Sequence, residues 1–206
     1  MSQFFQIHPE NPQLRLIRGA VEIIKQGGVV VYPTDSCYAL GCQIGDKKAV
    51  ERIRQIRQLD DKHNFTLMCR DMAEMSDYAI VDNIAYRFIR TLTPGPYTFI
   101  LPAMKSVPKR LLHPRRKTIG VRVPDNAITL ALLEELGEPI LSSTMVLPGE
   151  ALPMFDPYDM KETIGNQVDL IIDGGYCGME ATSVIEVLEE GPLLVRRGKG
   201  ADELVL

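Results

Sequence analysis

Short apolar strands that alternate with amphipathic helices constrain the fold of this chain most strongly. The run Val29–Tyr32 is apolar without a break, which is typical of a strand buried on both faces. A helix is predicted before this strand from apolar residues at helical spacing, namely Leu14, Ile17, Val21 and Ile24. Asn11-Pro12 is the predicted start of that helix and Gly27-Gly28 its predicted end.

The same alternation continues to the end of the chain. Asp46 is predicted to cap a second helix, and further helices are predicted through 71–92 and over 127–137, the last closed by Gly137. The remaining predicted strands are 65–69, 97–103, 118–124 and 139–144, followed by VDLIIDGG, TSVIEVL and PLLVRRG. The strand at 118–124 alternates apolar and polar residues, so one of its faces is predicted to be polar. The pattern predicts an α/β fold in which helices flank one twisted mixed sheet, as a single domain over residues 1–206.

Composition and cysteine usage exclude several classes of protein. No apolar run approaches the length that spans a membrane, and the N-terminal MSQFFQIHPENPQ lacks the basic start and apolar stretch of a signal peptide. The four cysteines include no CxxC pair and are predicted to be reduced and mostly buried. The three histidines are widely separated, so no metal site is predicted. These features predict a cytoplasmic protein.

Hydroxyl and arginine side chains follow several of the predicted strands. Thr34-Asp35-Ser36 comes after the first strand, Ser142-Ser143-Thr144 ends another, and Arg196-Arg197 follows the last. Ligands of open α/β sheets bind beyond the carboxyl ends of strands, and guanidinium groups bind phosphate or carboxylate with two hydrogen bonds. Together with Arg122, these residues predict a site for an anionic ligand. Capping, turn formation and surface ion pairs explain the same residues and remain the alternative.

Common motifs of phosphate binding and nucleophilic catalysis are absent from the sequence. There is no GxxxxGK[ST], and neither RRGKGA nor DGGYCG has the spacing of a dinucleotide-binding loop. His63 is predicted to be a solvent-facing loop residue. Cys37 has no adjacent histidine or cation in the sequence to activate its thiol, so a buried structural role is favoured over catalysis.

One segment is strongly basic although the formal net charge of the chain is −4. Residues 105–117 contain six basic side chains and no acidic one. Contact with the phosphates of RNA depends on such a local excess of positive charge. The predicted RNA-binding residues are Lys109, Arg110, Arg115, Arg116 and Lys117.

Five sequence blocks occur in an order that is specific to one protein family. They are VVVYPTDSCYALGC, TPGPYTFILPA, TIGVRVPD, PILSST and ATSVIEVLEEGPLLVRRG. In this order they resemble the motif blocks of the YrdC family, and most closely those of its YciO branch. The resemblance spans residues 14–200, nearly the whole chain. It implies a YrdC-like twisted α/β sheet around a deep, positively charged cavity.

The resemblance also implies an activity. Full members of the family make threonylcarbamoyl-adenylate from ATP, L-threonine and bicarbonate and release pyrophosphate. The product serves the modification of an adenosine in tRNA, and members have been linked to binding of double-stranded RNA. Magnesium would accompany ATP, and no tightly bound cofactor is expected.

Individual residues of this chain match functional positions of the family. The residues matched to substrate contacts are Thr34, Arg122, Ser142 and Ser183. The residues matched to nucleotide contacts are Arg57, Thr118, Thr144 and Arg196. Among them, Arg57 and Thr144 are the predicted catalytic residues, and Arg122 is expected to hold the carboxylate of threonine.

The first departure from the family lies at the end of the second helix. Synthases carry a Lys-x-Arg pair there, whereas this chain has RQL, with Arg57 in place of the lysine and Leu59 in place of the arginine. Either Arg54 together with Arg57, or Lys62, is a candidate substitute for the missing pair.

The second departure is in the Ser-x-Asn motif, which reads TMV here. Thr144 keeps a hydroxyl, but Val146 has no side-chain amide. Loss of two hydrogen bonds to charged groups would remove about 3–6 kcal/mol of binding, which is enough to slow a synthase or to leave only a binding protein.

Two functions therefore remain open. The first is a nucleotide-binding enzyme with weak or altered threonylcarbamoyl-adenylate synthase chemistry. The alternative is a non-catalytic protein that binds double-stranded RNA or tRNA through the rim of the cavity and the segment 105–117. A purely structural domain is hard to reconcile with so many polar residues at strand ends.

Overall fold

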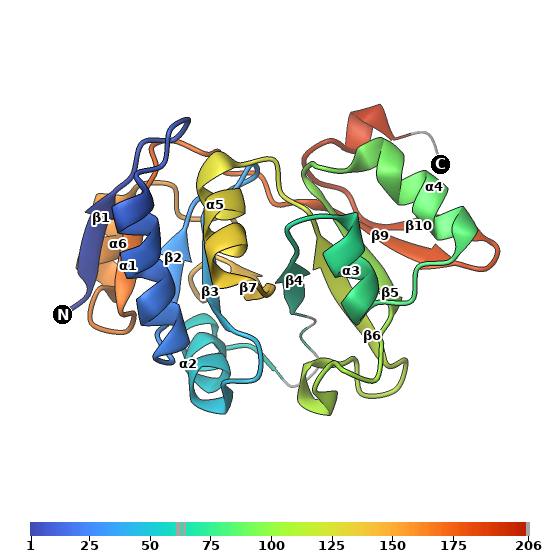
Figure 1. The fold of residues 1–206 in the computed structure, drawn as a ribbon, viewed down its shortest axis with the longest axis horizontal. Helices are drawn as coiled ribbons and strands as arrows, with labels where there is room; N and C mark the ends of the chain where they lie inside the picture. Colours follow the sequence, from blue (N-terminus) through green and yellow to red (C-terminus); the bar gives the residue numbers. More distant parts are fainter. Residues whose placement is uncertain (61–62, 64, 205–206) are drawn as a thin grey trace.

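The computed structural model describes residues 1–60, 63 and 65–204, and in this part of the chain one ten-stranded sheet carries helices on both faces (Figure 1). The strands are β1 (Gln3–Gln6), β2 (Val30–Tyr32), β3 (Ala39–Gln43), β4 (Thr66–Met68), β5 (Tyr97–Pro102), β6 (Thr118–Arg122), β7 (Ile140–Thr144), β8 (Leu170–Asp173), β9 (Ser183–Leu188) and β10 (Gly191–Arg196). The helices are α1 (Leu14–Lys25), α2 (Lys47–Arg57), α3 (Met72–Tyr78), α4 (Asn83–Leu92), α5 (Ala127–Leu136) and α6 (Pro157–Ile164). The predicted α/β class with one mixed sheet is confirmed.

The order of strands in the sheet differs from their order in the chain. It runs β1-β8-β2-β3-β7-β4-β6-β5-β9-β10. β3 is antiparallel to both β2 and β7, whereas β4 is parallel to β6 and β5 is parallel to β9. The first and last strands of the chain, β1 and β10, therefore lie at the two edges of the sheet, and β3, β7, β4 and β6 occupy its middle.

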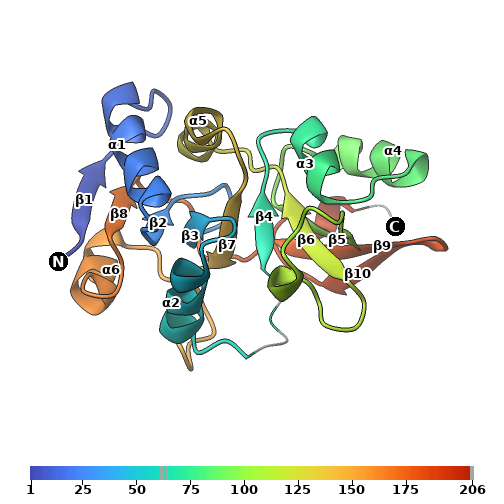
Figure 2. The ribbon, with the colours of Figure 1, turned by 60° about the horizontal axis from the view of Figure 1, so that its bottom comes forward.

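Helices cover the two faces of the sheet unequally. Figure 2 shows α1 and α5 on one side of β2, β3 and β7, and α2 and α6 on the other side. The buried apolar residues of α3 and α4 belong to the same apolar cluster as those of α2 and α6, so these four helices cover one face and α1 and α5 the other. One buried apolar cluster includes Ile17 and Val21 of α1 and Leu132 of α5. A second cluster includes Ile53 of α2 and Met160 of α6. Of the helices in the described ranges, none combines the length and apolar character of a membrane span.

Capping residues fix the ends of two helices as the sequence predicts. The Oδ1 atom of Asp46 accepts a hydrogen bond of 2.9 Å from the backbone N–H of Ala49 at the start of α2. The α5 helix ends at Gly137, whose φ of 74° lies in the left-handed region that favours glycine. The apolar residues Val50, Ile53 and Ile56 of α2 are buried.

Two helix predictions were wrong in detail. α1 begins at Leu14 rather than at Asn11-Pro12, and Leu14 is 52% exposed, so the buried face of this helix starts at Ile17. The single helix predicted through 71–92 is two helices, α3 and α4. The break arises because Ala79 leaves the helix to form a β-bridge with Ala103, and the side chain of Asp82 then caps α4.

The strand predictions need two corrections. All five residues of β6 are buried, so this strand has no solvent-exposed polar face. Its neighbours β4 and β5 pair with it on both sides, and residues of its polar face turn toward a cavity rather than toward bulk water. β1 and β3 were not predicted at all.

Candidate functional site

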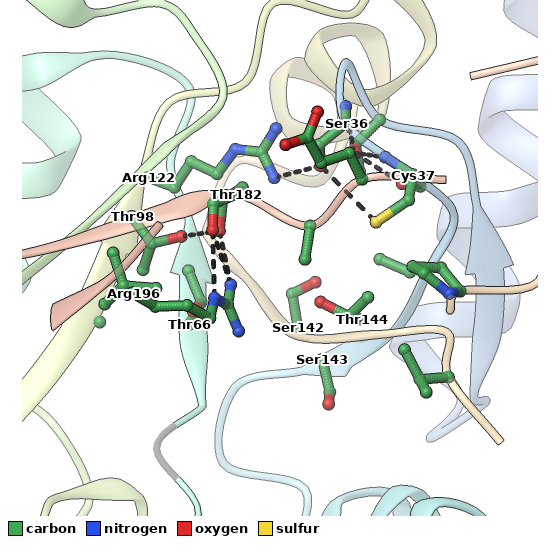
Figure 3. Close-up of a pocket in the computed structure, with 18 of the residues that line it drawn as sticks. Ser36, Cys37, Thr66, Thr98, Arg122, Ser142, Ser143, Thr144, Thr182 and Arg196 are labelled. Atoms are coloured by element: carbon green, nitrogen blue, oxygen red, sulfur yellow. Dashed lines mark hydrogen bonds between the residues drawn. The ribbon is translucent and has the colours of Figure 1, made fainter. Parts of the chain in front are cut away.

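A cavity of about 650 Å³ lies where the central strands meet (Figure 3). Alternate residues of β4, β5 and β6 line it, because successive side chains of a strand point to opposite faces of the sheet. The sequence-predicted residues that line this cavity are Thr34, Arg57, Arg122, Ser142, Thr144 and Arg196. The structure therefore brings three arginines and three hydroxyl groups, predicted from distant parts of the sequence, around one space.

Arg122 is held at one end of the cavity by the loop after β2. It is only 3% exposed. Its Nη2 atom donates to Oδ1 of Asp35 in an ion pair, Nη1 donates to Oγ of Ser36 over 3.2 Å, and Nε donates to the carbonyl of Gly95 over 3.4 Å. The guanidinium plane is thus fixed by three contacts from two separate loops and presents its remaining N–H groups to the cavity.

Thr34 and Ser142 line the cavity while also holding its walls. Oγ1 of Thr34 donates to the carbonyl of Cys37 over 2.7 Å and accepts from the backbone N–H of Ser36 over 3.2 Å, which closes the loop into a tight turn. The hydroxyl of the buried Tyr32 donates to Oγ of Ser142 over 2.7 Å. Both side chains therefore have structural partners in addition to any ligand.

Arg57 lies at the end of α2 and points back toward β7. Its Nη1 atom donates to Oγ of Ser143 over 2.8 Å and to the carbonyl of Thr144. Its Nε atom is buried and, among the described residues, has no hydrogen-bond partner. Burial lowers the pKa of Arg57, but an arginine keeps its charge at neutral pH. This leaves a positively charged guanidinium group on the lining of the cavity.

Arg196, at the end of β10, approaches the same space from the other side. Its Nη2 atom donates to the carbonyl of Thr182 over 2.9 Å and to Oγ1 of Thr182 over 3.1 Å. Oγ1 of Thr182 also lies 3.0 Å from Oγ1 of Thr98 on β5. Figure 3 shows Arg196, Thr182 and Thr98 grouped opposite Ser142 and Thr144.

Two sequence-predicted site residues lie outside the lining of the cavity. Oγ of Ser183 donates to the carbonyls of Gly198 and Lys199, so this side chain braces the turn after β10 instead. Thr118 is buried at the far end of β6, and its Oγ1 has no partner among the described residues. Thr182, the neighbour of Ser183, takes the place in the cavity because strand residues alternate between faces.

The six basic residues of segment 105–117 are exposed and lie outside the cavity lining, whereas Val107 and Leu111 of the same segment are buried. Arg116 forms an ion pair of 2.7 Å with Glu186, and Arg110 donates to the carbonyl of Gly45. Nζ of Lys117 donates to the carbonyl of Pro114. Within the described ranges, Lys109 and Arg115 form no ion pair, so their charges face solvent.

His63 lines the cavity, and the prediction of a solvent-facing residue was wrong. Its ring packs edge-on against Phe65 at 5.4 Å, and Nε2 lies 3.5 Å from Oγ of Ser143. Burial, followed by the nearby charges of Arg57 and Arg54, lowers the pKa of His63 to about 4. The imidazole is therefore neutral at physiological pH.

Cys37 and the altered motif positions contribute little polar chemistry to the cavity. The thiol of Cys37 is buried, and this burial raises its pKa above the ordinary value, so it is not an activated nucleophile. Val146 lines the cavity, whereas Leu59 packs against the apolar core. Arg54 stacks over the ring of Phe65 and is not among the lining residues. Lys62, the other candidate substitute, lies outside the described residues.

Sequence reasoning missed several polar residues of the cavity. Thr66, Thr98 and Thr182 line it from β4, β5 and the start of β9. Thr66 and Thr98 lie in predicted strands, in which successive residues point to opposite faces of the sheet. The sequence did not show which of the two faces would line a cavity. Glu180 is the one carboxylate among the lining residues that the structure describes. No group of three potential metal ligands occurs within residues 1–60, 63 and 65–204.

The chain resembles known proteins over nearly its full length. A profile of the Sua5/YciO/YrdC domain, described as "Telomere recombination", matches residues 22–198. The chain is 60% identical over 200 residues to the Escherichia coli (strain K12) protein named "Uncharacterized protein YciO", with 97% of each covered. It is 32% identical over 159 residues to the threonylcarbamoyl-AMP synthase of Nitrosococcus oceani, and the match covers 77% of this chain and 85% of that relative.

Solved structures show the same relationship. The crystal structure of Escherichia coli YciO matches with a TM-score of 0.94, covering 97% of each chain at 60% identity. The structure of Sua5 from P. abyssi complexed with L-threonine matches with a TM-score of 0.87 at 26% identity, covering 96% of this chain and 58% of the other. By sequence profile, by identity and by fold, the chain belongs to the Sua5/YciO/YrdC family, as its five sequence blocks predicted.

Proposed function

We propose that the cavity binds a nucleoside triphosphate beside a small amino acid, L-threonine, and supports slow or altered threonylcarbamoyl-adenylate synthase chemistry. The observation that carries this proposal is the convergence of Arg57, Arg122 and Arg196 on one hydroxyl-lined cavity. A volume of about 650 Å³ is within the range of pockets that hold cofactor-sized ligands.

The contacts of the arginines suggest separate roles. Arg57 and Arg196 donate to neutral oxygens only and keep N–H groups for phosphate oxygens, where preorganised positive charge stabilises a transferring phosphoryl group. Arg122 is fixed in orientation and suits the carboxylate of the amino acid. Ser142 and Thr144 lie between the two ends and would hydrogen-bond either ligand.

Relatives support the same assignment. One relative is named a threonylcarbamoyl-AMP synthase, and the matching structure of P. abyssi Sua5 is that of a complex with L-threonine. Reduced activity is proposed because Leu59 packs against the apolar core and Val146 presents a hydrocarbon surface to the cavity. Neither residue can donate a side-chain hydrogen bond to a phosphate.

Magnesium fits this site only together with the nucleotide. Glu180 is the single carboxylate in the described lining, and the hydroxyl groups around it are weak ligands. Magnesium in nucleotide sites is held largely by phosphate oxygens and water. Bound in this way, the ion would neutralise phosphate charge, and the arginines would orient the chain of phosphates. The cytoplasmic location expected from the sequence is part of the same proposal.

Release of pyrophosphate tests the proposed chemistry directly. The purified chain, at high concentration with ATP, L-threonine, bicarbonate and magnesium, is expected to release pyrophosphate slowly and only when threonine is present. The control omits threonine or replaces it with alanine. Release that does not depend on the amino acid, or no release while both ligands bind, would contradict the synthase function.

RNA binding is the second candidate, and the exposed charges of Lys109 and Arg115 favour it. If segment 105–117 contacts RNA, replacing both residues with glutamine should weaken binding of a short RNA duplex. The slope of log binding constant against log salt concentration should become shallower by about one to two units. Binding is measured by fluorescence anisotropy at several salt concentrations. Glutamine at Lys47 and Lys48, on α2, provides the matched control. Equal effects of the two pairs would contradict a specific RNA surface.

A further inference from the structure

The proposed roles of the cavity residues do not account for Asp35, the buried ion-pair partner of Arg122. The side chains of Arg122 and Asp35 are only 4% and 11% exposed. Asp35 gives one carboxylate oxygen to Arg122, while its Oδ2 is buried with no hydrogen-bond partner among the described residues. Nζ of Lys199 donates to the backbone carbonyl of Asp35, which anchors the loop from the side of β10. Asp35 itself is not among the residues that line the cavity.

The three arginines of the cavity therefore differ in charge balance. Arg57 donates to Ser143 and to a backbone carbonyl, and Arg196 donates only to Thr182. In the described part of the chain neither forms an ion pair, whereas Arg122 faces the carboxylate of Asp35. At one end of the cavity, Arg57 and Arg196 have no ion-pair partner among the described residues, whereas at the other end the charge of Arg122 is paired with that of Asp35.

We infer that Asp35 is a specificity-determining positioning residue that neutralises Arg122 and so keeps phosphate groups at the Arg57–Arg196 end. A guanidinium group has five N–H donors, and Arg122 uses three of them for Asp35, Ser36 and Gly95. The other two remain for a ligand. A zwitterionic amino acid has no net charge and suits a guanidinium group that is already paired, whereas a polyanion there would face the carboxylate of Asp35. The inference rests on the proposed function and deepens it.

Binding of inorganic triphosphate, measured by isothermal titration calorimetry, tests the inference. Because D35N leaves the positive charge of Arg122 unbalanced, this variant is expected to bind triphosphate about tenfold more tightly than the wild-type chain. Structural damage would instead weaken binding. In the R122Q background, the same D35N change is expected to bring no gain. D35E keeps the charge and should restore wild-type affinity.

The matched control is D202N. It removes one negative charge from the Asp202–Arg197 pair, whose side chains are 91% and 67% exposed, so solvent screens the change and triphosphate affinity should stay the same. Equal tightening in D35N and D202N would overturn the inference, since net charge alone would explain it. No tightening in D35N, or the same tightening in the R122Q background, would overturn it as well.

Two further outcomes separate this inference from the proposed function. If wild-type chain binds no triphosphate but D35N does, the polyphosphate site of the proposed function fails and the role of Asp35 stands. If D35N does not fold, single variants of the arginines decide the question. R122Q should then weaken triphosphate binding by no more than about twofold, while R57Q weakens it strongly. Equal losses in R122Q and R57Q would overturn the inference.

Discussion

Replacing Arg57 with glutamine is expected to weaken the binding of a nucleoside triphosphate about 100-fold. Arg57 lines the cavity, and among the described residues no carboxylate balances its charge. Two charge-assisted hydrogen bonds to phosphate contribute about 3 kcal/mol, which corresponds to a factor of about 100 in affinity. Glutamine keeps most of the length of the side chain but loses the charge. The measurement is calorimetric titration with a non-hydrolysable ATP analogue.

Arg54 offers the matched control for this experiment. It lies one turn earlier on α2, stacks over Phe65 and donates to the carbonyl of Asp60, outside the cavity lining. R54Q removes the same charge from the same helix, and we expect less than about a threefold change in affinity because Arg54 lies outside the cavity lining. Thermal melting of both variants checks that the fold is intact. Similar losses in R54Q and R57Q would mean that helix charge in general, rather than a phosphate contact of Arg57, governs binding.

The elements that were predicted well are those whose stability is largely local. α2 has a capping aspartate and a regular apolar face, α5 has a glycine at its end, and β2 is a continuous apolar run. Each of these signals lies within about a dozen residues of sequence, so no knowledge of the tertiary structure was needed. The motif blocks then supplied the overall fold, because their order is shared with the family.

The strands that were missed depend on distant partners. β1 (Gln3–Gln6) is a four-residue edge strand that pairs in parallel with β8, whose first residue is Leu170. β3 contains Gly41, and it forms a strand because β2 and β7 pair with it on both sides. Glycine weakens strand propensity, but a Cβ atom at this position would lie 2.6 Å from the ring of Tyr32, so packing requires a small residue here.

The candidate site was only partly visible in the sequence for a related reason. Alternation along a strand shows that two sets of residues face opposite sides of the sheet. Which set packs under helices and which set lines a cavity depends on which face the helices cover. Thr182 and Ser183 are neighbours, and only the structure shows that Thr182 faces the cavity while Ser183 braces the turn after β10. The Asp35–Arg122 ion pair joins residues that are 87 positions apart, beyond the reach of any local pattern.

Because of His63, the free energy of unfolding of the wild-type chain is expected to fall as the pH is lowered. The variant H63N should lack this contribution. The pKa of His63 is lowered from an ordinary value near 6.5 to about 4 by burial and by the charges of Arg57, Arg54 and Arg196, with Asp60 acting in the opposite direction. Between these two values the unfolded chain binds the proton and the folded chain does not. The free energy of unfolding therefore decreases as the pH falls from about 6.5 to about 4, and it is unaffected by this residue above that range.

The expected size of this effect makes it measurable. Between about pH 7.5 and about pH 5, the wild-type chain should lose about 2 kcal/mol of unfolding free energy relative to H63N. Urea unfolding at both pH values, followed by circular dichroism, gives the difference. H113N is the control, because His113 lies in the segment 105–117 outside the cavity. If H63N and the wild-type chain lose stability in parallel, His63 does not sit among these arginines as a buried neutral imidazole, and the electrostatic description of this end of the cavity is wrong.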